Sequence, residues 1–487
     1  MVQQQFMIQT TWRCLVALML VWLGNGTIRA QTEFTPGHIQ PKVVCQENAD
    51  HSYALYLPKA YTKDKKWPIV YAFDPGGNGS APVELLQEAA EDLGYIVVGS
   101  NNSHNGLNVP ISEIVRIFWR DTRQRLSFDE KQIYTAGMSG GCMVATAIAR
   151  LSKGEISGTF LVGSPRIPEL LESKQLPFIV FGSAGTSDFN YFHVRDIIET
   201  LQKNSIPSTF VVFDGTHGWC DKQTARSALE WFDLQAMKTG RKPKNEAWLT
   251  AFYEKQIATA RELETAGMSG AAYWKLVNLN RDYAGLTPTP ELDSKIQALK
   301  NTKPVQQWFK DEVDLRRRHS AKMEEFFGHY HGLFDEEGQF ESFSAMRSLI
   351  SPLKKQAADR TPSVSRQVAT MVLDHCFIMM FEESMRYFST SEYRKAITCL
   401  EIDADIRPTD QGPWYYIACA YAEMHDAKRA VTALKKVVEL GPVRRAVIEK
   451  NKHFDPIAKE EAFQKWLASL GQPASEAKEK DGNNGDK

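Results

Sequence analysis

The sequence predicts a mainly parallel α/β sheet in the first half of the chain, followed by an all-α helical domain. From residue 31 to about 237, short β-branched or aromatic runs alternate with helical stretches, which is typical of β-α-β units. After the charged, turn-rich segment 238–244, β-type runs vanish and apolar residues recur at helical spacing. A glycine-rich turn with a central serine also joins one predicted strand directly to a helix.

The first thirty residues have the pattern of a secretory signal peptide. Arg13 precedes a short apolar run, 14–23, and a polar stretch follows that ends at Ala30. The run has about ten residues, well below the roughly 20 that a helix needs to cross a bilayer. We therefore expect cleavage after Ala30, export to the periplasm or the outside, and no stable membrane anchor.

Charge and cysteine content exclude some classes of function. The chain carries 58 basic and 59 acidic residues, so its neutral balance gives no support for a nucleic-acid or anionic-membrane partner. Six cysteines remain after the predicted cleavage, and none has metal-ligand spacing: Cys45, Cys142, Cys220, Cys376, Cys399 and Cys419. An oxidising compartment permits a disulfide between Cys45 and Cys220, although nothing in the sequence supports that pairing.

Seven strands and four helices are expected in a sheet domain that covers residues 31–240. The strands are predicted at 53–57, 69–74, 95–100, 132–136, 158–162, 178–182 and 209–213. The helices between them are predicted at 82–93, 109–126, 141–151 and 191–204. Seven strands suffice for an enzyme sheet of this kind.

The sequence Gly137-Met-Ser-Gly-Gly141 follows the predicted strand 132–136 and precedes an alanine-rich helix. Strand, tight turn and helix form the context that a nucleophile elbow requires, and the glycines allow the strained turn. Ser139 is therefore the candidate nucleophile. A near duplicate at Ser269 follows a charged helical stretch instead of a strand and lacks the final glycine, so we expect a turn between helices there.

A base and an acid for Ser139 follow the last two predicted strands. His217 lies on a glycine-flanked loop after strand 209–213, where it can reach over the elbow; His104 follows an earlier strand and is less well placed. Asp188 is the one carboxylate in the loop after strand 178–182 and would orient the imidazole. Asp214 is too near His217 in sequence, and Asp221 is a weak alternative. The order serine, aspartate, histidine is the order expected for this elbow.

Backbone N–H groups are expected to stabilise the developing oxyanion. One donor is the N–H of Gly140, which follows the nucleophile. The second should come from the loop after strand 69–74, Pro75-Gly-Gly-Asn-Gly79. Because Pro75 has no N–H, Gly76 or Gly77 must serve.

Residues 241–370 are expected to form a helical region. Residues 245–282 and 304–327 have the spacing of amphipathic helices, with a proline-containing break between them. His329 and His331 lie near the acids at 335–337, but a solvated helix end explains them better than a metal site, so no metal and no cofactor are expected. The polar tail 471–487 is expected to be disordered.

A period of 34 residues appears late in the chain. Trp414, Ile417, Ala418, Tyr421, Ala430, Leu434 and Pro442 have the spacing of a tetratricopeptide repeat, and Ser384, Tyr387, Ala396, Leu400 and Pro408 precede five of them by one period. We therefore expect tetratricopeptide-like repeats at 371–470, with an unrelated helical hairpin as the alternative. Such repeats stack on each other and most often dock another protein or the neighbouring domain.

Four segments together resemble the α/β-hydrolase esterases: FDPGGNG (73–79), GMSGG (137–141), GSAGTSDFNY (182–191) and GTHGW (215–219). The similarity is to the secreted group around poly(3-hydroxybutyrate) depolymerases, feruloyl esterases and phospholipase/carboxylesterase-like enzymes, and it covers only the first half of the chain. It implies ester hydrolysis through an acyl-enzyme on Ser139, with His217 acting first as base and then as acid. Asp74 and Pro75 stand where many lipases carry His-Gly, and this departure affects the assignment of the oxyanion donors more than that of the triad.

These features predict an exported serine carboxylesterase-type hydrolase. Only about fourteen residues, 163–176, separate two predicted strands at the place where lids are usually inserted, so the cleft is open unless the helical domain covers it. An open cleft suits a small-molecule or polymeric ester, and a protein partner could bind the repeats. Two alternatives stay open: a serine peptidase or amidase on the same fold, and a non-catalytic scaffold whose repeats bind protein.

Overall fold

The computed structural model describes residues 34–106, 111–286, 290–334 and 339–470. The predicted signal peptide and the predicted disordered tail lie outside these ranges. Within the same ranges, no helix combines the length and the apolar character needed to cross a membrane.

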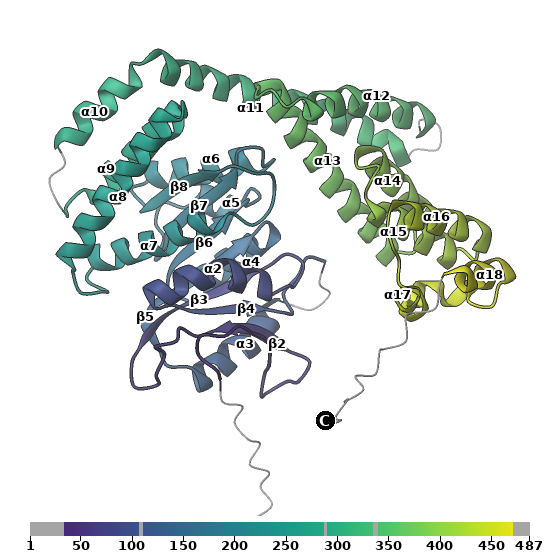
Figure 1. Ribbon diagram of the computed structural model, residues 1–487, viewed down its shortest axis with the longest axis horizontal. Helices are drawn as coiled ribbons and strands as arrows, with labels where there is room; N and C mark the ends of the chain where they lie inside the picture. Colours follow the sequence, from purple (N-terminus) through teal and green to yellow (C-terminus); the bar gives the residue numbers. More distant parts are fainter. Residues whose placement is uncertain (1–33, 107–110, 287–289, 335–338, 471–487) are drawn as a thin grey trace, which may run out of the picture.

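An eight-stranded sheet forms the first half of the chain (Figure 1), in the order β1-β2-β4-β3-β5-β6-β7-β8. The strands are β1 Gln40–Val44, β2 Ser52–Tyr56, β3 Trp67–Phe73, β4 Ile96–Ser100, β5 Phe128–Met138, β6 Ile156–Val162, β7 Ile179–Gly185 and β8 Ser208–Phe213. β2 pairs antiparallel with β1 and β4, and all other pairs are parallel. The expected mainly parallel sheet is confirmed, with one edge strand, β1, that the sequence did not predict.

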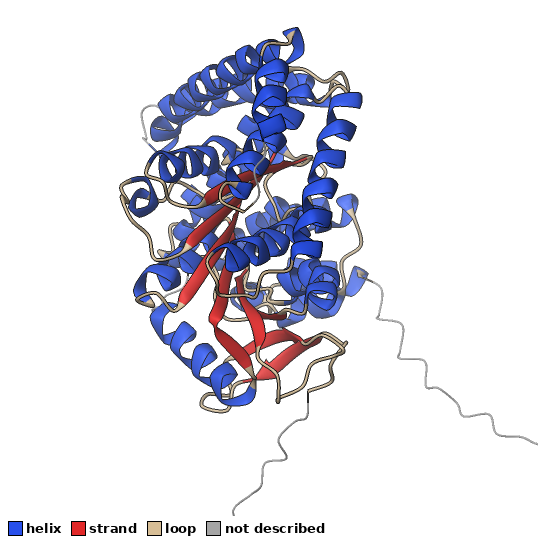
Figure 2. Cartoon of the chain, turned by 90° about the vertical axis from the view of Figure 1, so that its left-hand side faces the viewer, coloured by secondary structure: helices blue, strands red, loops and turns tan. Residues whose placement is uncertain are grey.

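Helices cover both faces of this sheet (Figure 2). They are α2 Ser80–Leu93, α3 Ile111–Arg125, α4 Gly140–Leu151, α5 Pro168–Leu171, α6 Tyr191–Lys203 and α7 Lys222–Lys238. Side chains alternate across a strand, so Ile69 and Tyr71 of β3 pack with α3, α4 and α6, whereas Val70 packs with α2 and α7. The result is one apolar core on each face, which fixes the sheet and the loops at its carboxyl edge.

The described residues after α7 form helices and no strands, as expected for the second half of the chain. The α-helices are α8 Glu246–Thr265, α9 Ser269–Tyr283, α10 Pro290–Lys300, α11 Lys303–Tyr330, α12 Gln339–Ala358, α13 Val364–Ser389, α14 Tyr393–Ile406, α15 Gln411–Glu423, α16 Ala427–Leu440, α17 Arg445–Lys450 and α18 Glu461–Ser469. Short 3-10 helices lie at His331–Phe334 and Lys452–Ile457. Ser269 starts α9 after a turn at Gly267 (φ 78°), as predicted, while the predicted break contains α10.

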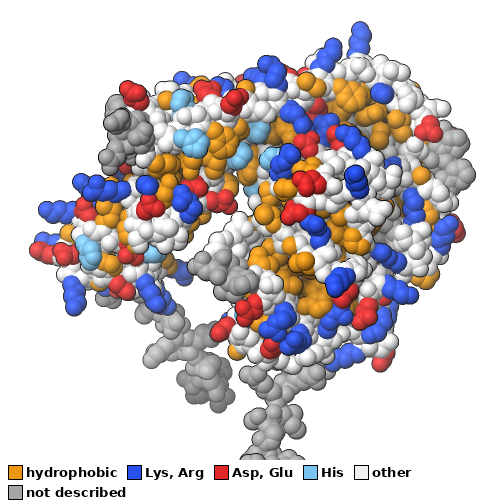
Figure 3. Space-filling view, turned by 180° about the vertical axis from the view of Figure 1, so that it is seen from behind, with side chains coloured by type: hydrophobic (Ala, Val, Ile, Leu, Met, Phe, Trp, Pro, Cys, Tyr) orange, Lys and Arg blue, Asp and Glu red, His pale blue; other side chains and the backbone are white. Residues whose placement is uncertain are grey.

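The helical half curves around the sheet and packs on it at several places. α8 and α9 lie beside α7, α10 packs on α9, α11 crosses past α6, and α13 returns toward the sheet (Figure 1). Glu312 of α11 binds Arg195 of α6 (2.5 Å) and accepts a hydrogen bond from the hydroxyl of Tyr191 (3.1 Å). From behind, the space-filling view shows an opening between the C-terminal helices and the sheet, with apolar and histidine side chains above it (Figure 3).

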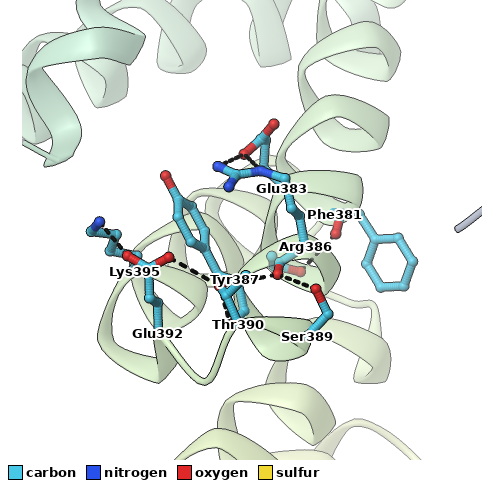
Figure 4. Close-up of polar contacts among 9 residues, drawn as sticks. Phe381, Glu383, Arg386, Tyr387, Ser389, Thr390, Glu392 and Lys395 are labelled. Carbon is cyan, nitrogen blue, oxygen red and sulfur yellow. Dashed lines mark hydrogen bonds and ion pairs between the residues drawn. The ribbon is translucent and has the colours of Figure 1, made fainter. Parts of the chain in front are cut away.

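Figure 4 shows the turn that joins α13 to α14. Thr390 Oγ1 donates to the carboxylate of Glu392 (3.0 Å), and the same carboxylate forms an ion pair with Lys395. The Arg386 guanidinium lies 4.3 Å from the centre of the buried Tyr387 ring. These contacts close the end of α13 and let α14 pack back along it.

Candidate active site

Ser139 lies on the turn between β5 and α4, with φ 49° and ψ −122°. A β-carbon on Gly137 would come within 2.2 Å of the Gly141 carbonyl oxygen, and one on Gly141 within 2.0 Å of the Phe73 carbonyl oxygen. Both neighbours must therefore be glycine. The backbone of Ser139 itself is strained, at a cost of about 1 to 3 kcal/mol that the packed strand and helix must offset.

His217 and Asp188 come together with Ser139 at the carboxyl edge of the sheet. His217 Nε2 is 2.9 Å from Ser139 Oγ, and His217 Nδ1 is 2.9 Å from Asp188 Oδ1. The side chain of His217 is 7% exposed and that of Asp188 is fully buried. With Nδ1 protonated and facing the carboxylate, Nε2 is free to accept the serine proton.

The loops after β7 and β8 hold this geometry. Thr186 N–H donates to the Phe213 carbonyl (2.8 Å) and Ser187 N–H to the Gly215 carbonyl (2.8 Å), which ties the two loops together. Asp188 Oδ1 also accepts the N–H of Asn190 (2.8 Å). These bonds fix the carboxylate that faces the imidazole.

Gly163, after β6, packs against the same pair. Its φ is +55°, and a β-carbon there would lie 2.6 Å from Asp188 Oδ2 and 3.1 Å from His217 Nδ1. Asp188 Oδ2 has no hydrogen-bond partner among the described residues. Position 163 therefore requires glycine, because its backbone conformation disfavours other residues and because a side chain would collide with Asp188 and His217.

The candidate oxyanion donors differ in whether their N–H groups already have a hydrogen-bond acceptor. Gly140 begins α4, so its N–H has no acceptor within the helix. The N–H of Gly76 donates to Asp74 Oδ1 (2.8 Å), and that of Gly77 to the Asp74 carbonyl (3.1 Å). Asp74 Oδ2 accepts from the indole of Trp219 (2.8 Å). The predicted role of Gly76 or Gly77 stays a prediction, and both N–H groups already have a partner.

Helix α13 crosses the loops that carry the site, which the sequence did not predict. Gln367 donates a hydrogen bond to the carbonyl of Thr186, in the loop of Asp188. The His375 ring stacks on Phe189 at 4.6 Å between centres, and Phe189 in turn lies 4.1 Å from His217. The helical half therefore forms one wall of the site.

One further histidine extends this aromatic stack. His319 of α11 lies 6.3 Å from His375, with nearly parallel rings. Burial lowers the pKa of His375 to about 3 and that of His319 to about 4, and the neighbouring histidines, His193 among them, add to both effects. Both rings are therefore neutral at pH 7.

The alternative site residues lie elsewhere. Asp221 caps α7 by accepting the N–H of Thr224 (2.8 Å), and Asp214 accepts a bond from Thr186 Oγ1 (3.3 Å). His104 Nδ1 contacts the carbonyl of Asn105 (2.8 Å). None of these bonds involves the Ser139–His217 pair.

All six cysteines of the described chain are buried and free, so Cys45 and Cys220 are not joined. Cys142 donates from Sγ to the carbonyl of Gly137 (3.0 Å) beneath the elbow, as a small buried thiol. Within the described residues no group of three or more His, Cys, Asp or Glu could hold a metal ion. The acids at 335–337 near His329 and His331 lie outside those residues.

The strand order, and a serine elbow after the fifth strand, match the architecture that the resemblance to α/β-hydrolases implies. No protein-family model and no curated protein matches the chain. Among solved structures, a ferulic acid esterase aligns at 17% identity over 40% of this chain and 96% of its own (TM-score 0.32).

Two other solved structures align at similar levels. An S-formylglutathione hydrolase from Staphylococcus aureus is 14% identical over 40% of this chain and 97% of its own (TM-score 0.34). Esterase B from Lactobacillus rhamnosis, inhibited by a tributyrin phosphonate, is 16% identical over 48% and 96% (TM-score 0.35). These likenesses are too low to support an argument about activity, which rests on the residues of this chain.

Proposed function

We propose that this protein is an exported serine hydrolase that cleaves carboxylic esters through an acyl-enzyme on Ser139. The observation that carries the proposal is the continuous hydrogen-bonded chain from Ser139 Oγ through His217 to the buried carboxylate of Asp188. Ser139 lies on a strained turn, and the N–H of Gly140, the first residue of α4, follows it directly. A scaffold without activity would gain nothing from that strain, which argues against the non-catalytic alternative.

In the first half of the proposed reaction, Ser139 Oγ attacks the ester carbonyl carbon while its proton passes to His217 Nε2. Asp188 holds the imidazole in the required tautomer and stabilises the imidazolium that forms. The N–H of Gly140 donates to the oxyanion of the tetrahedral intermediate. His217 then gives the proton to the departing alcohol, which leaves the acyl group on Ser139.

In the second half, a water molecule takes the place of the alcohol. His217 accepts a proton from the water as its oxygen attacks the acyl carbon, and the second intermediate collapses to release the acid. Ser139 recovers its proton from His217. No step needs a metal ion or cofactor as a reactant.

We also propose that the substrate is a small-molecule or polymeric ester. Gly163–Ile167 links β6 to the four-residue helix α5, and this short connection leaves no room for an inserted lid at that place. The wall formed by α13 would then decide how large an ester can enter. The first thirty residues support export, which cell fractionation with N-terminal sequencing of the mature protein would test.

The tetratricopeptide-like interpretation of 371–470 belongs to the same proposal. α13 with α14, and α15 with α16, form two successive helical hairpins in which Ala396, Leu400, Ala430 and Leu434 are buried at equivalent positions. Equivalent burial one period apart supports stacked repeats. We propose that they dock the neighbouring sheet and could also bind a protein partner.

Steady-state kinetics on p-nitrophenyl esters of increasing acyl length and on the matched p-nitroanilides tests the proposed activity. We expect turnover of at least one ester, little turnover of anilides, and loss of turnover in Ser139→Ala and His217→Ala that fold as the wild type does. Faster cleavage of the anilides would favour the amidase alternative. No turnover by the wild type, or unchanged turnover by Ser139→Ala, would sink the proposal.

A further inference from the structure

The ring of Phe189 lies between two histidines at the carboxyl edge of the sheet. Its centre is 4.1 Å from that of His217 and 4.6 Å from that of His375. We propose that Phe189 is a positioning residue whose face stabilises the imidazolium that His217 becomes when it accepts the proton of Ser139. This inference rests on the proposed function and adds to it a residue that acts through the base.

The imidazole of His217 meets the face of Phe189 and not its edge. Aromatic pairs usually keep their centres roughly 4.5 to 7 Å apart, and a ring that approaches edge-on needs the longer distances. Centres 4.1 Å apart, with 33° between the planes, require rings that overlap face to face. The hydrogen bonds of His217 with Ser139 and Asp188 lie at the edges of the imidazole, so they leave this face to Phe189.

The face of a phenyl ring attracts a cation, because it carries the negative part of the ring quadrupole. A neutral imidazole gains little from it, whereas an imidazolium gains a charge interaction. In the proposed reaction, the proton leaves Ser139 Oγ as that oxygen bonds to the acyl carbon, stays on His217 Nε2, and then passes to the departing alcohol. The stabilisation therefore arises with the transition state and acts on kcat more than on KM.

The loop after β7 fixes Phe189 from both sides. The N–H of Asn190 donates to Asp188 Oδ1 (2.8 Å), and Asn190 Nδ2 donates to the carbonyl of Gly163 (2.9 Å). The N–H of Tyr191 donates to the carbonyl of Asp188 (2.9 Å). Phe189 directly follows Asp188 in the sequence, so one loop sets both the carboxylate and the ring that contact the base.

His375 of α13 covers the other face of Phe189. One face has no room for two rings at these distances, so the two histidines lie on opposite faces. Burial lowers the pKa of His375 to about 3, and its ring is therefore uncharged at pH 7 and does not compete with His217 as a cation. The helical half thereby supports the base from behind.

The test uses the full chain with p-nitrophenyl butyrate as the probe. Residue 189 is replaced by phenylalanine that carries one, two or three ring fluorines, which change its volume little but weaken the negative charge on its face stepwise. We expect kcat to fall with each fluorine, by about tenfold over the series, with KM within threefold. Phe189→Leu, which keeps an apolar side chain without an aromatic face, should also lose about tenfold in kcat.

The pH dependence of kcat/KM gives a second readout. Because the ring favours the charged imidazole, Phe189→Leu should move the acid limb of the profile toward lower pH. A merely structural defect would lower the whole profile without moving that limb. The variant leaves unchanged the other charged or titratable groups around His217, which include Asp188, His375, Asp374 and Arg407.

Phe192→Leu is the matched control. Phe192 is 6% exposed, as Phe189 is, and its ring contacts Tyr191 and Arg316. This variant should keep kcat within threefold of the wild type and leave the acid limb in place. If Phe189→Leu does not fold, the fluorinated series, which keeps the ring, decides alone.

Equal kcat values across the fluorinated series would overturn the inference, because Phe189 would then act by its volume alone. An unmoved acid limb in folded Phe189→Leu, or an equal fall in Phe192→Leu, would overturn it as well. Wild-type protein that neither turns over the ester nor reacts with a fluorophosphonate would instead contradict the proposed function. The two failures are therefore distinguishable.

Discussion

At the scale of single residues, the site depends on short distances that leave little freedom. His217 lies between Ser139 and Asp188 at 2.9 Å from each, and Gly163 fills the space beside the carboxylate. Catalysis of the proposed kind needs the base within hydrogen-bond reach of the serine proton. Changes that keep the fold but move one of these groups should therefore act on kcat more than on stability.

Asp188→Asn should lower kcat about 10⁴-fold for the best ester. The amide keeps the shape of the carboxylate, but it favours the wrong tautomer of His217 and cannot stabilise the imidazolium. Steady-state kinetics at pH 7 and 8 checks this, with circular dichroism to confirm folding. A loss of less than tenfold would show that another carboxylate orients the imidazole.

Gly163→Ala should lower kcat about 10²-fold, because its methyl group would displace Asp188 and His217. Gly240→Ala is the matched control. Gly240 also has a left-handed backbone (φ +72°), but nothing lies within 4 Å of a β-carbon there. Both variants should lose about 1 to 2 kcal/mol of stability from backbone strain. Equal kcat values for the two would contradict the packing described for Gly163.

At the scale of elements, α13 links the helical half to the site. Gln367 of this helix donates a hydrogen bond to the loop of Asp188, and His375 stacks on Phe189. Glu382 accepts a hydrogen bond from Asn105. Repeats of this kind usually present a surface to a partner. In this chain, the first helix of the predicted repeats uses part of that surface to cover its own sheet.

The buried histidines of α13 and α11 make this packing sensitive to acid. An unfolded histidine titrates near pH 6.5, whereas His375 and His319 have pKa values of about 3 and about 4 when folded. The unfolded chain binds more protons below pH 6.5, so stability is complete above that pH and falls as the pH drops toward 4. The titratable or charged groups around the stack include His193, His217, Asp188, Asp374 and Arg407.

His375→Phe should reduce the loss of folding stability at acid pH, because phenylalanine keeps a ring stacked on Phe189 but cannot take up a proton. Thermal unfolding from pH 7.5 to 4.5 should show a smaller fall in melting temperature for the variant than for the wild type. Parallel curves for the two proteins would mean that His375 does not contribute to acid sensitivity.

At the scale of the whole molecule, the two halves share their apolar cores. One core joins side chains of the sheet to Leu315, Met323 and Phe326 of α11, and continues into α13 and α14. The other joins α2 and α7 to α8, α9 and α10. Such continuity favours a single cooperative unfolding transition.

Glu312→Ala tests this cooperativity. It leaves Arg195 without its partner on α11, at a cost of roughly 3 kcal/mol for a largely buried pair. Loss of esterase activity and loss of helical circular dichroism should shift together to lower temperature. Asp314→Ala removes an exposed ion pair on the same helix and should leave both transitions at the wild-type temperature. Separate transitions for the two probes would contradict a shared core.

The sequence could predict the sheet and the residues of the site because both follow from local patterns. Ser139, Asp188 and His217 each follow a predicted parallel strand, and the carboxyl ends of such strands meet at one edge. β1 could not be predicted, since Pro41 weakens its pattern and its pairing with β2 creates it. The bond between Asn105 and Glu382 joins residues 277 positions apart, and no local pattern reports such a contact.

The most direct test of the central claim is to treat the full-length protein with a fluorophosphonate and measure the intact mass and the labelled peptide. The account predicts one adduct per chain, on Ser139, that is absent in Ser139→Ala and forms far more slowly in His217→Ala. No adduct on the folded wild type, or an adduct on another serine such as Ser269, would contradict it.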